Sequence, residues 1–276
     1  MTRRHAGEAL HVTNGDSVAQ TLRATSLGGT VLSWRDVLHE GPLAFELAES
    51  RSIRGRFLAA RGWGDGASIR EELRIRDELL ERAARERRPI VLWFEHDLYD
   101  QLQLLQILAA LGEAAAGDVE LVQADEYLGG MDAEMLEELF ERRRRVTTEQ
   151  FALAADAWHA VCENSIEDLL PRETSALPYL APALRRLLEE REPLPRTKRQ
   201  LLRALADGPK TPLELFAANQ AQEDALFLGD AWCFQIVREL AEAGLVTPVP
   251  VPPPRGDYGA FTATRVALTA AGRELV

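Results

Sequence analysis

The stretch Pro89-Ile90-Val91-Leu92-Trp93-Phe94, followed at once by Glu95-His96-Asp97, decides the fold. A run without a polar side chain predicts a strand that is covered on both faces, as in a parallel sheet between two layers of helices. The next segment, Leu98–Leu111, is apolar nearly all round and predicts a buried helix. A buried strand that leads directly into a buried helix is typical of the α/β class.

Three further segments repeat this alternation of strand and helix. Glu8–Val12 is short and apolar, and a helical pattern follows it. Thr30–Trp34 and Asp118–Val122 are the other two strand candidates. Because such alternation produces parallel strands joined by right-handed crossovers, we expect an α/β domain in residues 1–130, with an open, mostly parallel sheet and flanking helices.

Residues 131–195 are predicted to be a helical connector. Asp132–Arg145 and Thr147–Glu163 have helical patterns, and the second begins with a capping box completed by Gln150. The remaining residues, 164–195, are rich in proline and predict a connection between two bodies.

Residues 196–276 predict a winged-helix-like domain, because three helices, a hairpin and a last helix follow one another. The expected elements are helices that begin at capping boxes at Thr197 and Thr211, a helix over Asp230–Ala243, a hairpin of Leu245–Val246 with Thr262–Leu268, and a helix capped by Thr269.

Composition restricts the class of protein. The chain has 276 residues, 46% of them hydrophobic, and a formal net charge of -12, which is globular and argues against a protein built to hold nucleic acid. We expect a cytoplasmic protein, since no apolar run of about 18 residues predicts a membrane span and the first residues do not form a signal peptide. The two cysteines form no disulfide framework or thiolate zinc site. Residues 196–276 hold nine Lys and Arg against nine Asp and Glu, so DNA binding is disfavoured there too.

Polar side chains follow three of the predicted strands where ligands bind in open α/β sheets. The candidate acid–base groups or metal ligands are His39, Glu40, Glu95 and His96. The candidate substrate-binding residues are Asn14, Asp16, Ser17, Trp34, Arg35, Asp36, Asp97, Asp100 and Gln101.

Helix capping explains some of these residues without any function. Asp16 or Ser17 is a natural N-cap, and so is Asp97. Asp100 favours the dipole of the same helix. Capping does not explain Glu95 or the histidine after it, since a charged pair directly after a buried strand is costly to bury.

Three mechanisms are compatible with these residues. A divalent metal could be held by carboxylate and imidazole groups, although no metal-binding spacing is present and the ligands stay open. The pool of ligands comprises Asp16, His39, Glu40, Glu95, His96 and Asp97. A histidine oriented by a carboxylate could perform acid–base catalysis without a metal. The Asn14-Gly15-Asp16-Ser17 turn could present backbone donors to an anion, although Asp16 would repel it.

Several motifs resemble one bacterial family, the domain of unknown function numbered eighteen thirty-five. The motifs are Leu10-His11-Val12-Thr13-Asn14-Gly15-Asp16-Ser17, Trp34-Arg35-Asp36-Val37-Leu38-His39-Glu40-Gly41-Pro42, Trp93-Phe94-Glu95-His96-Asp97-Leu98-Tyr99-Asp100-Gln101-Leu102, Thr211-Pro212-Leu213-Glu214-Leu215-Phe216 and Phe227-Leu228-Gly229-Asp230. The resemblance covers nearly the whole chain and implies a kind of protein without implying a reaction.

Two hypotheses about function follow. The first is an enzyme that acts on a small polar or phosphorylated substrate at the strand ends, by acid–base or metal-assisted chemistry. The second is a regulator or adaptor that senses a ligand and uses the winged-helix region to contact DNA or a protein. Both expect a small-molecule ligand and no membrane.

Overall fold

The computed structural model describes residues 9–115, 117–170, 172–252 and 258–276. The chain forms two compact units. Met1–Phe57 and Gly66–Arg185 belong to the first unit, and Leu58–Asp65 and Arg186–Val276 belong to the second. Among the described residues, no helix is both long and apolar enough to cross a membrane.

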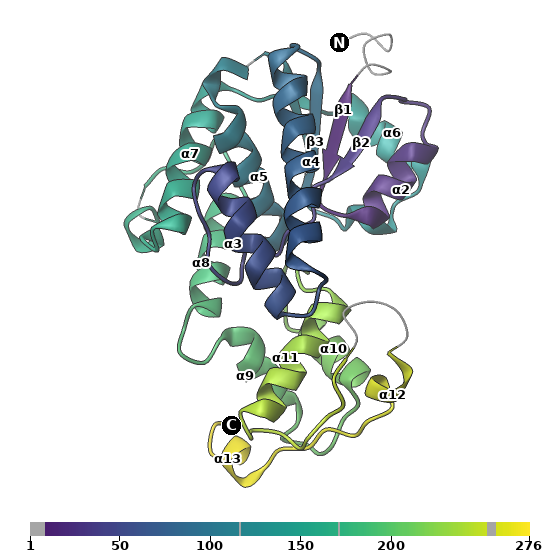
Figure 1. The fold of residues 1–276 in the computed structure, drawn as a ribbon, viewed down its shortest axis with the longest axis vertical. Coiled ribbons are helices and arrows are strands. Elements are labelled where there is room, and N and C mark those ends of the chain that lie inside the picture. The colour runs from purple at the N-terminus through teal and green to yellow at the C-terminus, as the bar shows by residue number, and fades with distance from the viewer. Residues whose placement is uncertain (1–8, 116, 171, 253–257) are drawn as a thin grey trace. The chain divides into compact units, whose positions relative to one another are not determined.

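Strands and helices alternate along the first unit (Figure 1). In chain order they are β1 (Leu10–Thr13), α2 (Asp16–Ala24), β2 (Thr30–Ser33), α3 (Leu47–Ala60), α4 (Gly66–Arg85), β3 (Ile90–Glu95), α5 (Leu98–Leu111), η1 (Glu113–Ala115), β4 (Val119–Ala124), η2 (Leu128–Gly130), α6 (Ala133–Glu141), β5 (Arg144–Arg145), α7 (Thr148–Cys162), η3 (Ile166–Asp168) and α8 (Leu180–Glu190). The boundaries of the first unit fall inside two of these helices: α3 from Leu58 on and α8 from Arg186 on belong to the second unit.

The five strands form one open sheet in the order β2-β1-β3-β4-β5. β1 pairs in parallel with both β2 and β3, and β3 pairs in parallel with β4. The expected mostly parallel α/β sheet is therefore confirmed, with Glu8 of the first predicted strand outside the described residues. Because the chain adds β2 on one side of β1 and β3 on the other, the strand order reverses between β1 and β3, where open sheets bind ligands.

The fifth strand corrects a prediction. The helix expected over Asp132–Arg145 ends at Glu141, and Arg144–Arg145 pair antiparallel with β4 instead. Arg143 turns the chain, because its guanidinium donates to the Phe140 carbonyl at 2.6 Å and to Glu120 of β4 at 2.7 Å.

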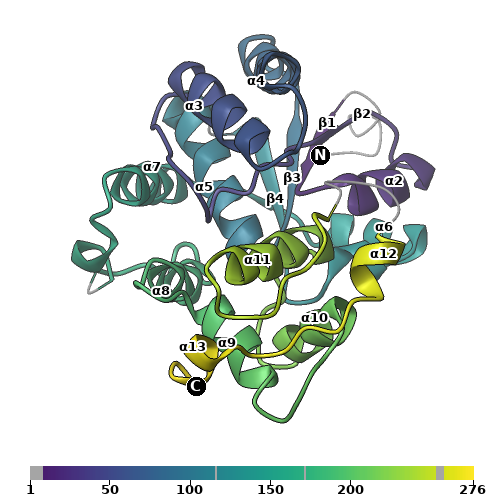
Figure 2. The same ribbon diagram turned by 60° about the horizontal axis from the view of Figure 1, so that its bottom comes forward.

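Helices cover both faces of this sheet. On one face, Val91 and Trp93 of β3 pack with residues of α2 and α6, and Trp93 stacks on Phe140 with ring centroids 6.1 Å apart. α4 and α5 lie on the other face (Figures 1 and 2). All six residues of β3 are buried, so this strand is the centre of the core that the apolar run predicts.

The second unit is mainly helical, with α9 (Arg196–Ala204), α10 (Pro212–Gln220), α11 (Asp230–Glu242), α12 (Gly259–Thr262) and α13 (Ala270–Arg273). The capping boxes at Thr147 and Thr211 are confirmed, and Thr269 caps α13 as expected. The box at Thr197 is wrong, because α9 begins one residue earlier and the Thr197 hydroxyl donates to Glu190 at 2.9 Å.

The described residues do not show the expected winged helix. Two isolated antiparallel bridges, Lys210 with Val266 and Val246 with Leu268, stand in place of a two-stranded wing. The helix α12, Gly259–Thr262, precedes the predicted second strand and takes its first residue, Thr262; Phe261 of this helix is buried against Phe234, with ring centroids 5.2 Å apart. Residues 253–257 of the connecting loop lie outside the described residues.

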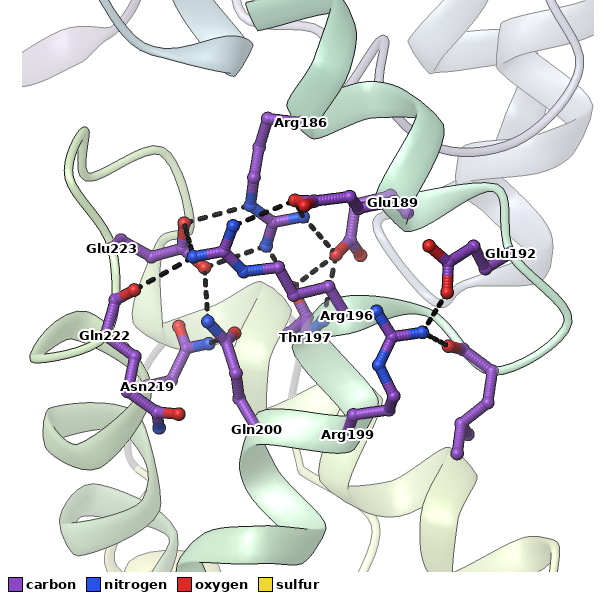
Figure 3. Close-up of polar contacts among 12 residues, drawn as sticks. Arg186, Glu189, Glu192, Arg196, Thr197, Arg199, Gln200, Asn219, Gln222 and Glu223 are labelled. Carbon is purple, nitrogen blue, oxygen red and sulfur yellow. Dashed lines mark hydrogen bonds and ion pairs between the residues drawn. The ribbon is translucent and has the colours of Figure 1, made fainter. Parts of the chain in front are cut away.

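A buried ionic network joins the end of α8, the start of α9 and the turn that follows α10 (Figure 3). The Arg186 guanidinium donates to Glu190 at 2.6 Å, to both oxygens of Glu223 at 2.9 and 2.8 Å, and to Thr197 at 3.0 Å. Gln200 also donates to Glu223 at 2.9 Å. Arg196 is a second cation beside Glu223, at 3.7 Å, so two guanidinium groups face the two carboxylates and the network has a structural role.

Candidate functional site

Four polar side chains meet where the strand order reverses. Asn14 directly follows β1, Glu95 is the last residue of β3, and Asp97 and Asp100 stand at the start of α5. β1 and β3 are neighbours in the sheet, with Thr13 beside Trp93 in register, so their carboxyl ends lie together. The topology thus gathers residues that are about eighty positions apart in sequence, as the strand-end hypothesis expects.

Hydrogen bonds hold this acidic cluster in place. The Asn14 amide donates to Asp100 Oδ1 at 2.7 Å and reaches Glu95 Oε1 at 3.5 Å. The backbone N–H of Glu95 donates to Asp100 Oδ2 at 2.6 Å, and the N–H of Leu128 donates to Glu95 Oε1 at 3.0 Å. Asp100 therefore ties β1 to β3, and Glu95 is oriented by one of its two oxygens.

The electrostatics of the cluster favour protonated carboxyls. Burial raises the pKa of Glu95 from 4.5 to about 8, and the neighbouring Asp100 carboxylate adds to the rise. Burial also raises the pKa of Asp100 to about 7, against the lowering effect of its hydrogen bonds from Glu95 and Asn14. Burial and both neighbouring carboxylates raise the pKa of Asp97 well above its ordinary value. Negative charges this close cannot all persist without a proton or a cation.

The same three carboxylates are the candidate metal ligands. Glu95, Asp97 and Asp100 each offer an oxygen, and these oxygens lie within 4.8 Å of one another. All-oxygen ligation of this kind suits a hard divalent cation such as Mg²⁺ or Mn²⁺. Chemically, the cluster can either share protons or bind such an ion.

Helix capping accounts for part of the cluster and corrects one prediction. Asp97 is the N-cap of α5 and accepts the Asp100 N–H at 3.1 Å, which confirms that prediction. At α2, however, Gly15 is the N-cap and no side chain caps the helix. Asp16 instead pairs with Arg35 at 3.2 Å, and Ser17 donates to the Gly129 carbonyl at 3.1 Å.

The segment that follows β2 is organised by a buried arginine on α3. Arg54 is fully buried and donates to Asp36 at 3.0 and 2.8 Å, and also to backbone carbonyls, including that of Glu40 at 2.6 Å. Gly41 has a φ of 78°, and a Cβ atom there would stand 2.5 Å from the Phe57 ring. Asp36 is therefore the ion-pair partner of Arg54. The predicted contact of Asp36 with a substrate stays a prediction.

The predicted histidines contact aromatic rings. His39 is buried and meets Tyr99 edge-on, with ring centroids 6.3 Å apart. His96 meets Tyr179 edge-on, with centroids 5.8 Å apart. Glu40 contributes its carbonyl to Arg54. The catalytic roles assigned to His39, Glu40, Glu95 and His96 stay predictions.

The remaining candidates make structural contacts. Gln101 donates to the Glu95 carbonyl at 2.6 Å, which fixes the turn after β3. Trp34 is buried, donates to Gln106 at 2.8 Å and lies under the Arg76 guanidinium. Arg35 is half-exposed and adopts a left-handed φ of 39°, a strained conformation for a residue with a side chain.

Sequence reasoning missed Arg54 and Tyr179. Arg54 lies in a helix so rich in charge that nothing in its pattern separates it from the exposed Arg56 two positions on. Its partners are mostly backbone carbonyls, which carry no sequence signal. Tyr179 lies in the proline-rich stretch, which predicts a connection and no contact with a strand end.

No family model matches this chain, and no curated protein matches it. The resemblance to the domain-of-unknown-function family therefore stays a prediction, and the site rests on its geometry.

Proposed function

We propose that the protein is an enzyme that acts on a small polar substrate at the carboxyl ends of β1 and β3, with Glu95 as its acid–base group. The observation that carries the proposal is the set of three buried carboxylates, from Glu95, Asp97 and Asp100, gathered within 4.8 Å at the reversal of the strand order.

The hydrogen bonds distinguish the roles of the three acids. Asp97 caps a helix, and Asp100 accepts donors on both oxygens, so these two are positioning residues. The hydrogen bonds to Glu95 engage Oε1, which leaves Oε2 to meet a substrate. Asn14 and His96 are half-buried beside it, so the cluster has a side towards solvent.

A carboxyl group that exchanges its proton near neutral pH is suited to this chemistry. Burial and Asp100 raise the pKa of Glu95 to about 8. A general acid or base works best when its pKa is close to the working pH. In the protonated form Glu95 could protonate a leaving group, and in the ionised form it could accept a proton from the substrate.

The alternative of a DNA-binding regulator receives less support from the second unit. The basic side chains at the start of α9 are paired with acids: Arg196 with Glu189 at 2.8 Å, Lys198 with Glu239 at 2.9 Å, and Arg199 with Glu192. Guanidinium and ammonium groups held by carboxylates are less able to neutralise phosphates.

The test is turnover of a panel of small polar and phosphorylated metabolites, followed by NMR, with the purified full chain and its Glu95→Gln variant. We expect Glu95→Gln to lower kcat on any converted compound by about 10²–10⁴-fold, because the isosteric amide cannot transfer the proton. Glu138→Gln, at an exposed site on α6, is the matched control and should keep full activity.

Two results would overturn the proposal. Absence of turnover of every compound in the panel would refute the proposal that the protein is an enzyme. Turnover that a chelator abolishes and Mg²⁺ or Mn²⁺ restores would replace the acid–base role of Glu95 with metal ligation by the same three acids.

A further inference from the structure

A cleft of about 210 Å³ opens at the carboxyl end of β4, beside the acidic cluster. Val122, Met131 and Leu139 make its apolar part. Asp125 and Glu126 reach it from the loop after β4, and Arg142 reaches it from the end of α6. Its volume is below the range of about 300–1,000 Å³ typical of drug-sized ligands, so it suits a small molecule.

The cleft belongs to the same edge and face of the sheet as Glu95. Glu95 and Ala124 are register partners on β3 and β4. Leu128, which donates to Glu95, lies three residues before Met131 of the cleft wall. On the other side, burial and the Asp125 carboxylate raise the pKa of Tyr179, which places Asp125 near the ring that His96 contacts.

Opposite charges line the cleft without neutralising one another. Arg142 forms no ion pair with Asp125, Glu126 or any other acid among the residues that the structure describes. Gln123 and Ala124 complete the cleft lining.

We infer that this cleft binds a small zwitterion, a molecule that carries a carboxylate and a protonated amine on a short apolar frame, as α-amino acids do. The carboxylate meets Arg142, and the amine meets Asp125 and Glu126. The apolar frame rests on Val122, Met131 and Leu139. This inference rests on the proposed function, since it names the class of substrate brought to Glu95.

The recognition follows from the chemistry of the charged groups that line the cleft. A guanidinium binds a carboxylate through two parallel N–H donors. The amide of a glutamine side chain in place of the arginine cannot form this pair of hydrogen bonds to a carboxylate. Two carboxylates give an ammonium group several acceptors at once. Because neither charge is neutralised inside the protein, a ligand with one charge would leave the other unmatched.

Calorimetric titration of the full chain with L-valine, 3-methylbutanoate and isobutylamine tests the inference, since the last two each lack one charged group of valine. We expect valine to bind about tenfold or more tightly than either analogue. If valine does not fit the length of the cleft, the comparison is repeated with the standard amino acid that binds most tightly. The two analogues are then the compounds that lack the amine or the carboxylate of that amino acid. Equal binding of the carboxylate analogue, or no binding of any amino acid, overturns the inference.

Arg142→Gln should lower the affinity of the amino acid by about tenfold or more, whereas Arg144→Gln, an exposed site on β5, should leave it unchanged. Glu95→Gln should keep binding. Binding without turnover in the wild type would refute the proposed function and leave the zwitterion site standing. Turnover of a compound without both charges, unaffected by Arg142→Gln, would refute the zwitterion site and leave the enzyme standing.

Discussion

Glu95 has an unusual environment for an acidic residue. It is 3% exposed, follows five buried apolar residues and has Asp100 as its neighbour. An ionised carboxyl group buried there destabilises the folded protein, because its charge is removed from water. Such a group is costly to keep, and that cost is the physical reason to look for chemistry at this position.

Replacing Glu95 with Gln is expected to stabilise the protein, and more so as the pH rises. The folded protein holds the Glu95 proton up to about pH 8, whereas the unfolded chain releases it near pH 4.5. Between these values the folded state binds more protons, so the free energy of unfolding falls as pH rises. Glutamine has no such proton, and its advantage should grow to about 1–3 kcal/mol near pH 8.

Urea melts of the wild type and Glu95→Gln at pH 5 and pH 8 measure this difference. Glu138→Gln, which replaces an exposed glutamate, should show no comparable change with pH. A difference between wild type and Glu95→Gln that is the same at both pH values would mean that Glu95 is ionised throughout and neutralised by a cation.

Arg54 is the residue on which the segment after β2 depends. Replacing it with Met should cost about 3–5 kcal/mol, because Asp36 would be left as a buried charge without its partner. Arg56→Met, two positions along the same helix and exposed, should change the free energy of unfolding little. The double variant Asp36→Leu with Arg54→Met should recover part of the loss in urea melts, and no recovery would show that the backbone contacts of Arg54 dominate.

At the scale of single elements, capping chemistry was predictable because it is local. Thr147 and Gln150 satisfy each other's backbone donors at 3.2 and 2.9 Å, as their spacing of three residues predicts. Thr197 has the same spacing to Gln200, yet Arg186 and Glu190 take up its hydroxyl. A long-range charged partner outweighed the local pattern there, and no local pattern could reveal it.

Thr147→Ala should destabilise α7 and lower the free energy of unfolding of the protein by about 1 kcal/mol. The lost hydroxyl leaves the Gln150 N–H without its acceptor. Thr148→Ala, one position along and also exposed, keeps the cap and is the matched control. Equal effects of the two substitutions in a denaturant titration would show that the cap contributes nothing to stability.

At the scale of the whole molecule, the sheet was predictable in class but not in strand order. The buried run before Glu95 and the alternation around it predict a parallel sheet, which the structure has. The order β2-β1-β3-β4 depends on crossovers that the sequence does not encode locally, and it is this order that brings Asn14 to Asp100. The cleft at Arg142 was hidden for a related reason, since the predicted helix ran through the residue where α6 in fact stops.

The division into two units predicts that a substitution that destabilises one unit increases local unfolding in that unit alone. Every partner of Arg186 in its network lies in the second unit, and Arg186→Met would leave Glu190 and Glu223, both nearly buried, without their main cation. Since stability is local, hydrogen exchange measured on the full chain should rise in α9 and α10 and stay unchanged in β1 and β3. Arg203→Met, exposed on α9, should leave both regions as in the wild type. An equal rise in exchange across both units would show instead that the chain unfolds as one cooperative body, so that the Arg186 network stabilises the acidic site as well.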